Sequence, residues 1–226
     1  MAGSTSMSEK AEQETAGGHA ELMDRIYRHQ RYIYDLTRKY YLFGRDKLIA
    51  EMRLGPKARV VEIGCGTARN LVRIARRYPD AELFGLDASQ EMLKSAEETI
   101  RRAGLSRRIT LAHGYAEHLS PAMFSQSEGF DACLFSYSLS MIPDWKASIR
   151  AAEANLKPGG KIHAVDFADL TGLGRLGQAA MLFWLRLFHV APRVELLQAL
   201  QDQEGANFRL LPGRYAFLLS AERLKI

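Results

Sequence analysis

One short segment restricts the fold more than any other feature of the chain. Residues 59–63 have the composition of a short buried β-strand, and they run directly into a Gly64-Cys65-Gly66 turn. Glycine at two positions lets the backbone turn sharply and lets a ligand approach it closely. Glu62 lies just before the turn, and the residues after it are helical in pattern. A strand that ends in an acid, then Gly-x-Gly, then a helix is typical of a nucleotide-type cofactor site.

The rest of the chain alternates between strand patterns and helix patterns. We predict further strands at 81–86, 109–112, 130–135 and 161–166, and a closing hairpin of 208–211 with 215–221. We predict the intervening helices at 70–78, 89–103 and 145–156. Alternation of this kind builds βαβ units with a ligand site at the carboxyl ends of the strands. The predicted fold is therefore α/β, a doubly wound, seven-stranded, mostly parallel Rossmann-like sheet with an N-terminal helical cap.

The two ends of the chain differ from this centre. Residues 1–20 are small and polar, so they are predicted to form a disordered tail, and their opening resembles an expression leader. Residues 21–54 are predicted to form the helical cap, with a break near Gly44. Residues 55–226 are predicted to form the main domain, with an inserted apolar helix near 175–190.

A second acid indicates which cofactor the turn holds. Asp87 ends the next predicted strand, where a carboxylate accepts the hydroxyls of a ribose. A dinucleotide site would need a third glycine where this chain has Arg69, and Glu62 would repel a pyrophosphate. Glu62 suits a cationic ligand that carries an ammonium group beside a sulfonium. The predicted cofactor is S-adenosylmethionine, with S-adenosylhomocysteine as the product and no metal.

Segments after the later strands complete the predicted site. Tyr115-Ala116-Glu117 follows the third strand, where such folds hold adenine, and Ser136 follows the fourth. The predicted cofactor-binding residues are Glu62, Gly64, Cys65, Gly66, Asp87, Ala88, Met92, Tyr115, Ala116, Glu117, Ser136 and Tyr34. From residue 55 to 226 the chain resembles class I S-adenosylmethionine-dependent methyltransferases. It departs from them at Tyr115, where many members have an acid that bonds the adenine amine, which leaves that contact to Glu117 or to backbone.

The N-terminal segment narrows the resemblance. Residues 23–46, together with 62–70, resemble the bacterial diacylglyceryl-homoserine N-methyltransferases of betaine-lipid synthesis. The resemblance implies three successive methyl transfers to one amine, giving diacylglyceryl-trimethylhomoserine, and a partner enzyme that supplies the homoserine lipid. An amine needs groups that aim its lone pair, and a carboxylate suits an arginine fork. The expected positioning groups are Tyr137, Tyr32 and Tyr41, and the expected substrate groups are Arg31 and Arg45. Asp166 either contacts the substrate or caps a loop.

Two alternatives to the amino-lipid substrate stay open, and a third is disfavoured. Methylation of phosphatidylethanolamine or of a quinone precursor fits the same fold. A nucleic-acid methyltransferase fits the net charge of +5. However, 136–139 is Ser-Tyr-Ser-Leu rather than the Asn/Asp-Pro-Pro-Tyr of many base-methylating enzymes, so we expect no nucleic-acid partner. A binding module without turnover is disfavoured by the intact glycine turn.

The charge and the apolar helix together predict where the protein works. Helix 175–190 has a broad apolar arc, which indicates either a lipid-facing lid or an element packed against the sheet. No apolar run is long enough to cross a membrane, and two distant cysteines give no disulfide framework. We expect a cytoplasmic enzyme bound peripherally to the anionic inner face of the cell membrane.

Overall fold

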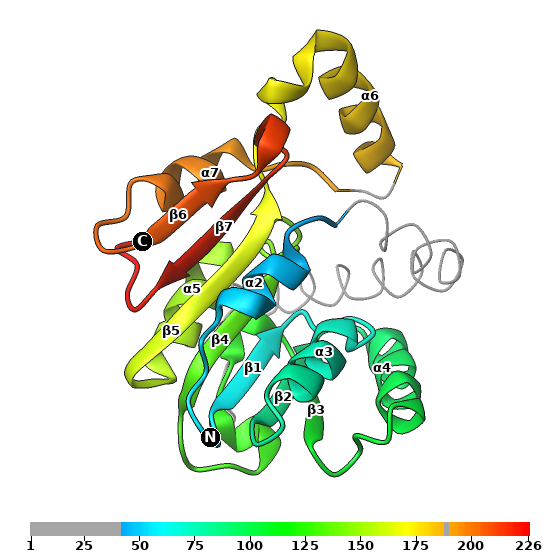
Figure 1. Ribbon diagram of the computed structural model, residues 1–226, viewed down its shortest axis with the longest axis vertical. Coiled ribbons are helices and arrows are strands. Elements are labelled where there is room, and N and C mark those ends of the chain that lie inside the picture. The colour runs from blue at the N-terminus through cyan, green and yellow to red at the C-terminus, as the bar shows by residue number, and fades with distance from the viewer. Residues whose placement is uncertain (1–41, 188–189) are drawn as a thin grey trace, which may run out of the picture.

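The computed structural model describes residues 42–187 and 190–226, and its seven strands form one sheet. The order across the sheet is β3-β2-β1-β4-β5-β7-β6 (Figure 1). The strands are β1 (Arg59–Ile63), β2 (Glu82–Asp87), β3 (Ile109–His113), β4 (Phe130–Ser136), β5 (Leu156–Phe167), β6 (Asn207–Leu210) and β7 (Ala216–Ala221). The first five strands are parallel, whereas β7 is antiparallel to both β5 and β6. The predicted seven-stranded, mostly parallel sheet and the closing hairpin are confirmed.

Helices cover both faces of the sheet (Figure 1). They are α2 (Arg45–Glu51), α3 (Arg69–Arg77), α4 (Gln90–Arg102), α5 (Trp145–Ala154), α6 (Gly174–Arg186) and α7 (Val194–Gln201). Neighbouring residues of a strand point to opposite faces, so Val60 joins one core with α2, α3 and α4, while Val61 joins the other with α5 and α7. The order of the strands reverses between β1 and β4, which is where α/β folds of this type bind ligands.

Local signals placed most of the element ends correctly. Ser89 caps α4 as predicted, because its hydroxyl accepts a hydrogen bond from the Met92 amide at 3.3 Å. β5 was predicted too short: it begins at Leu156, which pairs with Phe130 ahead of an irregularity in the β4 register. The Pro-Gly-Gly run after Lys157 therefore lies within the strand. Helix α7 was not predicted, because one eight-residue amphipathic stretch gives little periodic signal.

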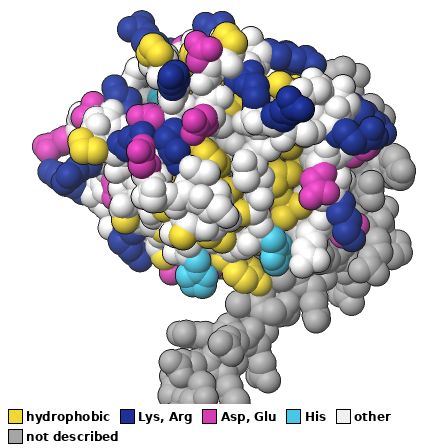
Figure 2. All heavy atoms as spheres, turned by 90° about the horizontal axis from the view of Figure 1, so that it is seen from below, with side chains coloured by type: hydrophobic (Ala, Val, Ile, Leu, Met, Phe, Trp, Pro, Cys, Tyr) yellow, Lys and Arg dark blue, Asp and Glu magenta, His cyan; other side chains and the backbone are white. Residues whose placement is uncertain are grey.

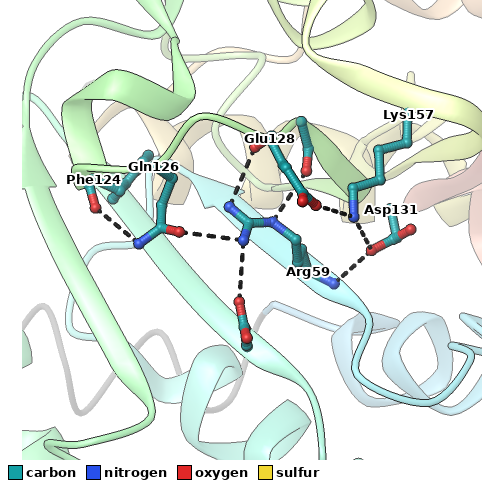
Figure 3. Close-up of polar contacts among 8 residues, drawn as sticks. Arg59, Phe124, Gln126, Glu128, Asp131 and Lys157 are labelled. Atoms are coloured by element: carbon teal, nitrogen blue, oxygen red, sulfur yellow. Dashed lines mark hydrogen bonds and ion pairs between the residues drawn. The ribbon is translucent and has the colours of Figure 1, made fainter.

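Arg59 makes hydrogen bonds that link neighbouring strands at the amino-terminal end of the sheet, opposite the ligand edge (Figure 3). Its guanidinium, which is largely buried, donates to the carbonyls of Gly129 and Glu128 and to the side chain of Glu82. Its amide donates to the Asp131 carboxylate at 2.8 Å. These bonds join the starts of β1, β2 and β4, so we assign Arg59 to the scaffold and not to the site.

Only the last part of the predicted cap lies within the described residues. The predicted tail (1–20) and residues 21–41 of the cap lie outside them. Gly44 has φ 86°, and α2 begins directly after it, whereas the helix predicted before this break lies outside the described residues. Asp46 in the first turn of α2 pairs with Arg69 at 3.1 Å and with Arg73 at 2.8 Å, and so ties α2 to α3. None of the helices described here is both long and apolar enough to cross a bilayer.

Candidate functional site

A pocket of about 410 Å³ opens at the carboxyl end of β1, where the strand order reverses. Its volume lies within the range of small-molecule sites in proteins. Six of the residues predicted for the site line it, namely Arg45, Glu62, Gly64, Cys65, Gly66 and Ser136. The structure therefore brings the glycine turn, the acid before it and the end of β4 together around one cavity.

The glycine turn is held in a conformation that other residues adopt poorly. Gly64 has φ 74° and Gly66 has φ 53°. A Cβ on Gly64 would lie 2.6 Å from the Cβ of Ser138, so no larger residue fits there. The Gly64 and Cys65 amides both donate to the Leu86 carbonyl of β2, at 2.8 and 3.0 Å. The turn is thus wedged between β2 and the segment after β4.

Asn70 joins the acid before the turn to the end of β4. Its amide nitrogen donates to Glu62 Oε1 at 2.7 Å and to Ser136 Oγ at 3.0 Å, and all three side chains are buried. Sequence reasoning missed Asn70 as a site residue, because the first turn of a helix after Gly-x-Gly carries no rule for its side chain. The bonds fix the Glu62 carboxylate at the pocket wall.

Asp87 supports the turn from the neighbouring strand. One carboxylate oxygen accepts from the Gly66 amide at 2.7 Å, and the other accepts from the Ser89 amide at 2.9 Å. A carboxylate oxygen has two lone pairs, so both oxygens can also accept a ribose hydroxyl. That contact with ribose stays a prediction.

The predicted adenine-side residues lie near β2 and β3, next to this turn, and not in the pocket wall. Ala88 follows β2, buried Met92 lies in α4, and Tyr115 precedes the short helix η1 (Ala116–His118), which contains Ala116 and Glu117. β2 and β3 pair in register, with Asp87 beside His113. These residues therefore lie along the same edge of the sheet as Asp87, which is the arrangement that an extended ligand would require. Their contacts with the cofactor stay predictions.

The electrostatics of the turn favour a cation. Burial, together with the nearby Asp87 and Glu62 carboxylates, raises the pKa of the Cys65 thiol well above its usual value. Cys65 is therefore a neutral thiol at pH 7 and no nucleophile. Two carboxylates that disfavour a third negative charge suit the ammonium and sulfonium of S-adenosylmethionine. Arg69 itself lines the pocket, where its guanidinium donates to Asn70 Oδ1 at 3.1 Å and pairs with Asp46 at 3.1 Å.

The other predicted residues fall into three groups. Buried Tyr137, at φ 56°, donates its hydroxyl to the Phe43 carbonyl at 2.6 Å and so fastens the chain before α2. Arg45 is buried against the pocket and donates from Nε to the Leu42 carbonyl at 3.0 Å. The remaining predicted residues, Tyr32, Tyr34, Tyr41 and Arg31, lie outside the described residues.

Asp166 caps a loop, which is the second of the two roles predicted for it. Its carboxylate accepts from the amides of Ser140 and Phe167 at 2.9 and 2.8 Å, and so caps the loop after β4. Burial raises its pKa to about 6, although the two amide bonds and Arg193 oppose the shift.

Known proteins resemble this chain in sequence. Residues 60–160 match a family model described as a methyltransferase domain. The ubiquinone/menaquinone biosynthesis C-methyltransferase UbiE of Syntrophotalea carbinolica is 29% identical over 184 residues, which cover 79% of this chain and 72% of that protein. The demethylmenaquinone methyltransferase of Listeria welshimeri is 30% identical over 129 residues, covering 57% of this chain and 52% of that protein. The chain thus spans only about half the length of the second relative.

Solved structures resemble it in fold. The S-adenosylmethionine-dependent methyltransferase SibL superimposes with a TM-score of 0.63 at 22% identity, covering 87% of this chain and 59% of that one. A SAM-dependent methyltransferase from Aquifex aeolicus gives 0.59 at 16% identity, covering 81% and 92%. At these identities the likeness establishes the fold alone. Residues 60–160 thus match a methyltransferase domain in sequence, and the sheet as a whole has the class I, S-adenosylmethionine-dependent methyltransferase fold.

Proposed function

We propose that this protein transfers the methyl group of S-adenosylmethionine to an acceptor with long apolar tails, and that the first candidate is a quinone precursor. The observation that carries the methyl-transfer proposal is the Glu62–Asn70–Ser136 network beside the Gly64 turn. The names of the relatives support the acceptor, since UbiE and the demethylmenaquinone methyltransferases act on quinone precursors by name. They favour this alternative over the betaine lipid that the N-terminal resemblance implied.

S-adenosylmethionine, when bound, supplies a methyl group activated by a positive sulfonium. Glu62, held by Asn70, would receive the ammonium group of the cofactor, and the turn at Gly64 lets the backbone approach it closely. Asp87 would receive the ribose hydroxyls beside Gly66. The protein's own contribution is to hold donor and acceptor in line and to exclude water, which accounts for much of the rate of such reactions.

Diacylglyceryl-homoserine is the second candidate, and one observation favours it. Arg45 places a buried guanidinium in the pocket lining. Arginine binds carboxylates through two parallel hydrogen bonds, and the homoserine headgroup has a carboxylate, whereas a quinone ring and phosphatidylethanolamine have none. The amine of the same headgroup would be the methyl acceptor, and Tyr137, which was predicted to position it, donates its hydroxyl to the Phe43 carbonyl. Three methyl transfers to that amine would then give the trimethylated lipid.

A methyl-transfer assay distinguishes the two acceptors. The full chain is incubated with labelled S-adenosylmethionine and vesicles that contain either demethylmenaquinol or diacylglyceryl-homoserine, and the products are read by mass spectrometry. One added methyl on the quinol supports the first candidate, and up to three on the amine support the second. Arg45→Met should abolish only the second activity, with exposed Lys47→Met in the same helix as the control. Cofactor binding without either product would overturn both acceptors, and no cofactor binding would overturn methyl transfer itself.

A further inference from the structure

Helix α6 presents large apolar side chains to solvent. Of the six exposed large hydrophobic residues in the described parts of the chain, four lie in α6 or at its C-cap Leu187, and a fifth, Val194, begins α7. Leu176 is 89% exposed, Phe183 66%, Leu187 50%, Val194 53% and Trp184 39%. Positions 176, 180, 183 and 187 recur at the spacing of one helix face, and Ala180 is exposed as well. The outward face of α6 is therefore a continuous apolar stripe.

The opposite face of α6 fixes this orientation. Leu185 is fully buried, and Met181 and Leu182 pack partly buried against the same core. Gln178 on that side donates to the Asp169 carbonyl at 3.0 Å. The helix has thus already buried one apolar face against the domain, and the stripe at Leu176 and Phe183 is a second one. A globular packing role needs only the first face.

The charged residues of the segment that carries the stripe have one sign. The segment 170–194 contains three arginines and no Asp or Glu. Arg175 and Arg186 are eleven residues apart, about three helical turns, so both lie along the same flank of the stripe, and both are exposed. The end of the molecule remote from α6 differs, because Lys and Arg there are interspersed with Asp and Glu (Figure 2). An exposed apolar helix face in a helix whose charged residues are both arginines is complementary to an anionic lipid surface.

The helix also lies at the working edge of the sheet. It follows β5 through the short helix η3 (Thr171–Leu173), and Figure 1 shows it beyond the arrowhead of β5, at the end toward which β1 also points. The pocket at the carboxyl end of β1 opens at this same edge. An acceptor with long apolar tails would have to reach the pocket from a bilayer on this side.

We propose that the outward face of α6, formed by Leu176, Ala180, Phe183, Trp184 and Leu187, inserts into the headgroup region of an anionic bilayer. Arg175 and Arg186 bind lipid phosphates at its flank. The inference deepens the proposed function, and rests on it, because it names the surface from which the acceptor is taken. The binding is reversible, since a single helix of this size is anchored by a few apolar side chains and two charges.

Trp184 is a built-in probe of this insertion. The chain has two tryptophans, and the other, Trp145, is buried in α5. In the full-length Trp145→Phe protein, adding vesicles of phosphatidylglycerol should shift Trp184 emission to the blue and protect it from aqueous quenchers. Vesicles of phosphatidylcholine alone should do so far less, and added salt should weaken the effect. An unchanged Trp184 spectrum at every lipid concentration would overturn the proposal.

A matched pair of variants separates insertion from charge. Leu176→Asp with Phe183→Asp should weaken partition into anionic vesicles by at least about tenfold, because two apolar side chains are lost from the interface. The control variant combines Ser127→Asp with Gln201→Asp, which are both exposed and outside α6. It adds the same charge and should change the partition into anionic vesicles little. Melting curves and cofactor titrations of both variants should match the wild type. Equal vesicle binding by the two variants would reject the insertion.

Other occupants of the stripe give different results. If a second copy of the chain covers it, sedimentation shows a dimer that Leu176→Asp with Phe183→Asp converts to a monomer. If another part of the same chain covers it, Trp184 emission is that of a buried indole before any lipid is added. Either result overturns the proposal. Failed vesicle binding with intact methylation of a detergent-dispersed acceptor rejects this inference alone, whereas intact binding without methylation rejects the proposed function alone.

Discussion

Replacing Asn70 with alanine should damage the cofactor site more than the fold. The amide nitrogen of Asn70 donates one buried hydrogen bond to the charged Glu62 and one to the neutral Ser136, and its oxygen accepts a less buried bond from Arg69. A bond to a buried charge contributes ~1.5–3 kcal/mol and a neutral one ~0.5–1.5 kcal/mol. We therefore expect Asn70→Ala to lower the free energy of unfolding by about 2–4 kcal/mol. The Glu62 carboxylate also loses its orientation, so affinity for S-adenosylmethionine should fall by about 10- to 100-fold.

Asn155 provides the control for this prediction. Its amide nitrogen also donates two hydrogen bonds, to the carbonyls of Leu119 and Ala151 at 2.8 Å each, at a distance from the pocket lining. Asn155→Ala should therefore lower the free energy of unfolding by about 1–3 kcal/mol and leave cofactor affinity unchanged. Urea unfolding measures the first quantity and isothermal titration calorimetry the second. If Asn70→Ala is destabilised yet binds the cofactor as the wild type does, Glu62 does not hold the ammonium group and the reasoning fails.

Three further perturbations test the turn and the core. Gly64→Ala should lower the melting temperature and abolish cofactor binding, because φ 74° and the Ser138 Cβ at 2.6 Å exclude a side chain; normal calorimetric binding would contradict this. Asp87→Ala should weaken cofactor binding by ~1–3 kcal/mol, since it removes an acceptor and releases the Gly66 amide; an unchanged titration would disprove it. Burial, and to a smaller extent the charge of Lys161, lowers the pKa of His163 to about 4. Between the ordinary histidine pKa of about 6.5 and pH 4, the unfolded chain therefore binds a proton that the folded chain does not bind. The contribution of His163 to stability should therefore fall by up to about 3 kcal/mol as pH drops from 6.5 through 4, and urea titrations read it as the difference between the wild type and His163→Gln, because the raised pKa of Asp166 acts in the opposite direction in both proteins.

The sequence by itself determined the elements whose signals are local. The strand before Gly64, the turn and the cap at Ser89 are read from neighbouring residues, because strand burial, left-handed backbone and capping bonds act over a few positions. The alternation of such units then implied a parallel sheet with its site at the carboxyl edge. Glu62 and Gly66 could be placed in that site without a structure, since the position of a turn at the end of a strand is fixed by the chain itself.

Tertiary structure alone decided which distant side chains meet and which faces stay open. Asn70 reaches Ser136 across 66 residues, and Tyr137 reaches Phe43 across 94, and no spacing along the chain encodes either bond. The sequence of α6 showed a broad apolar arc and left both the packed and the lipid-facing roles open. The fold buries Leu185 and leaves Phe183 exposed, because the domain offers an apolar partner to only one side of the helix.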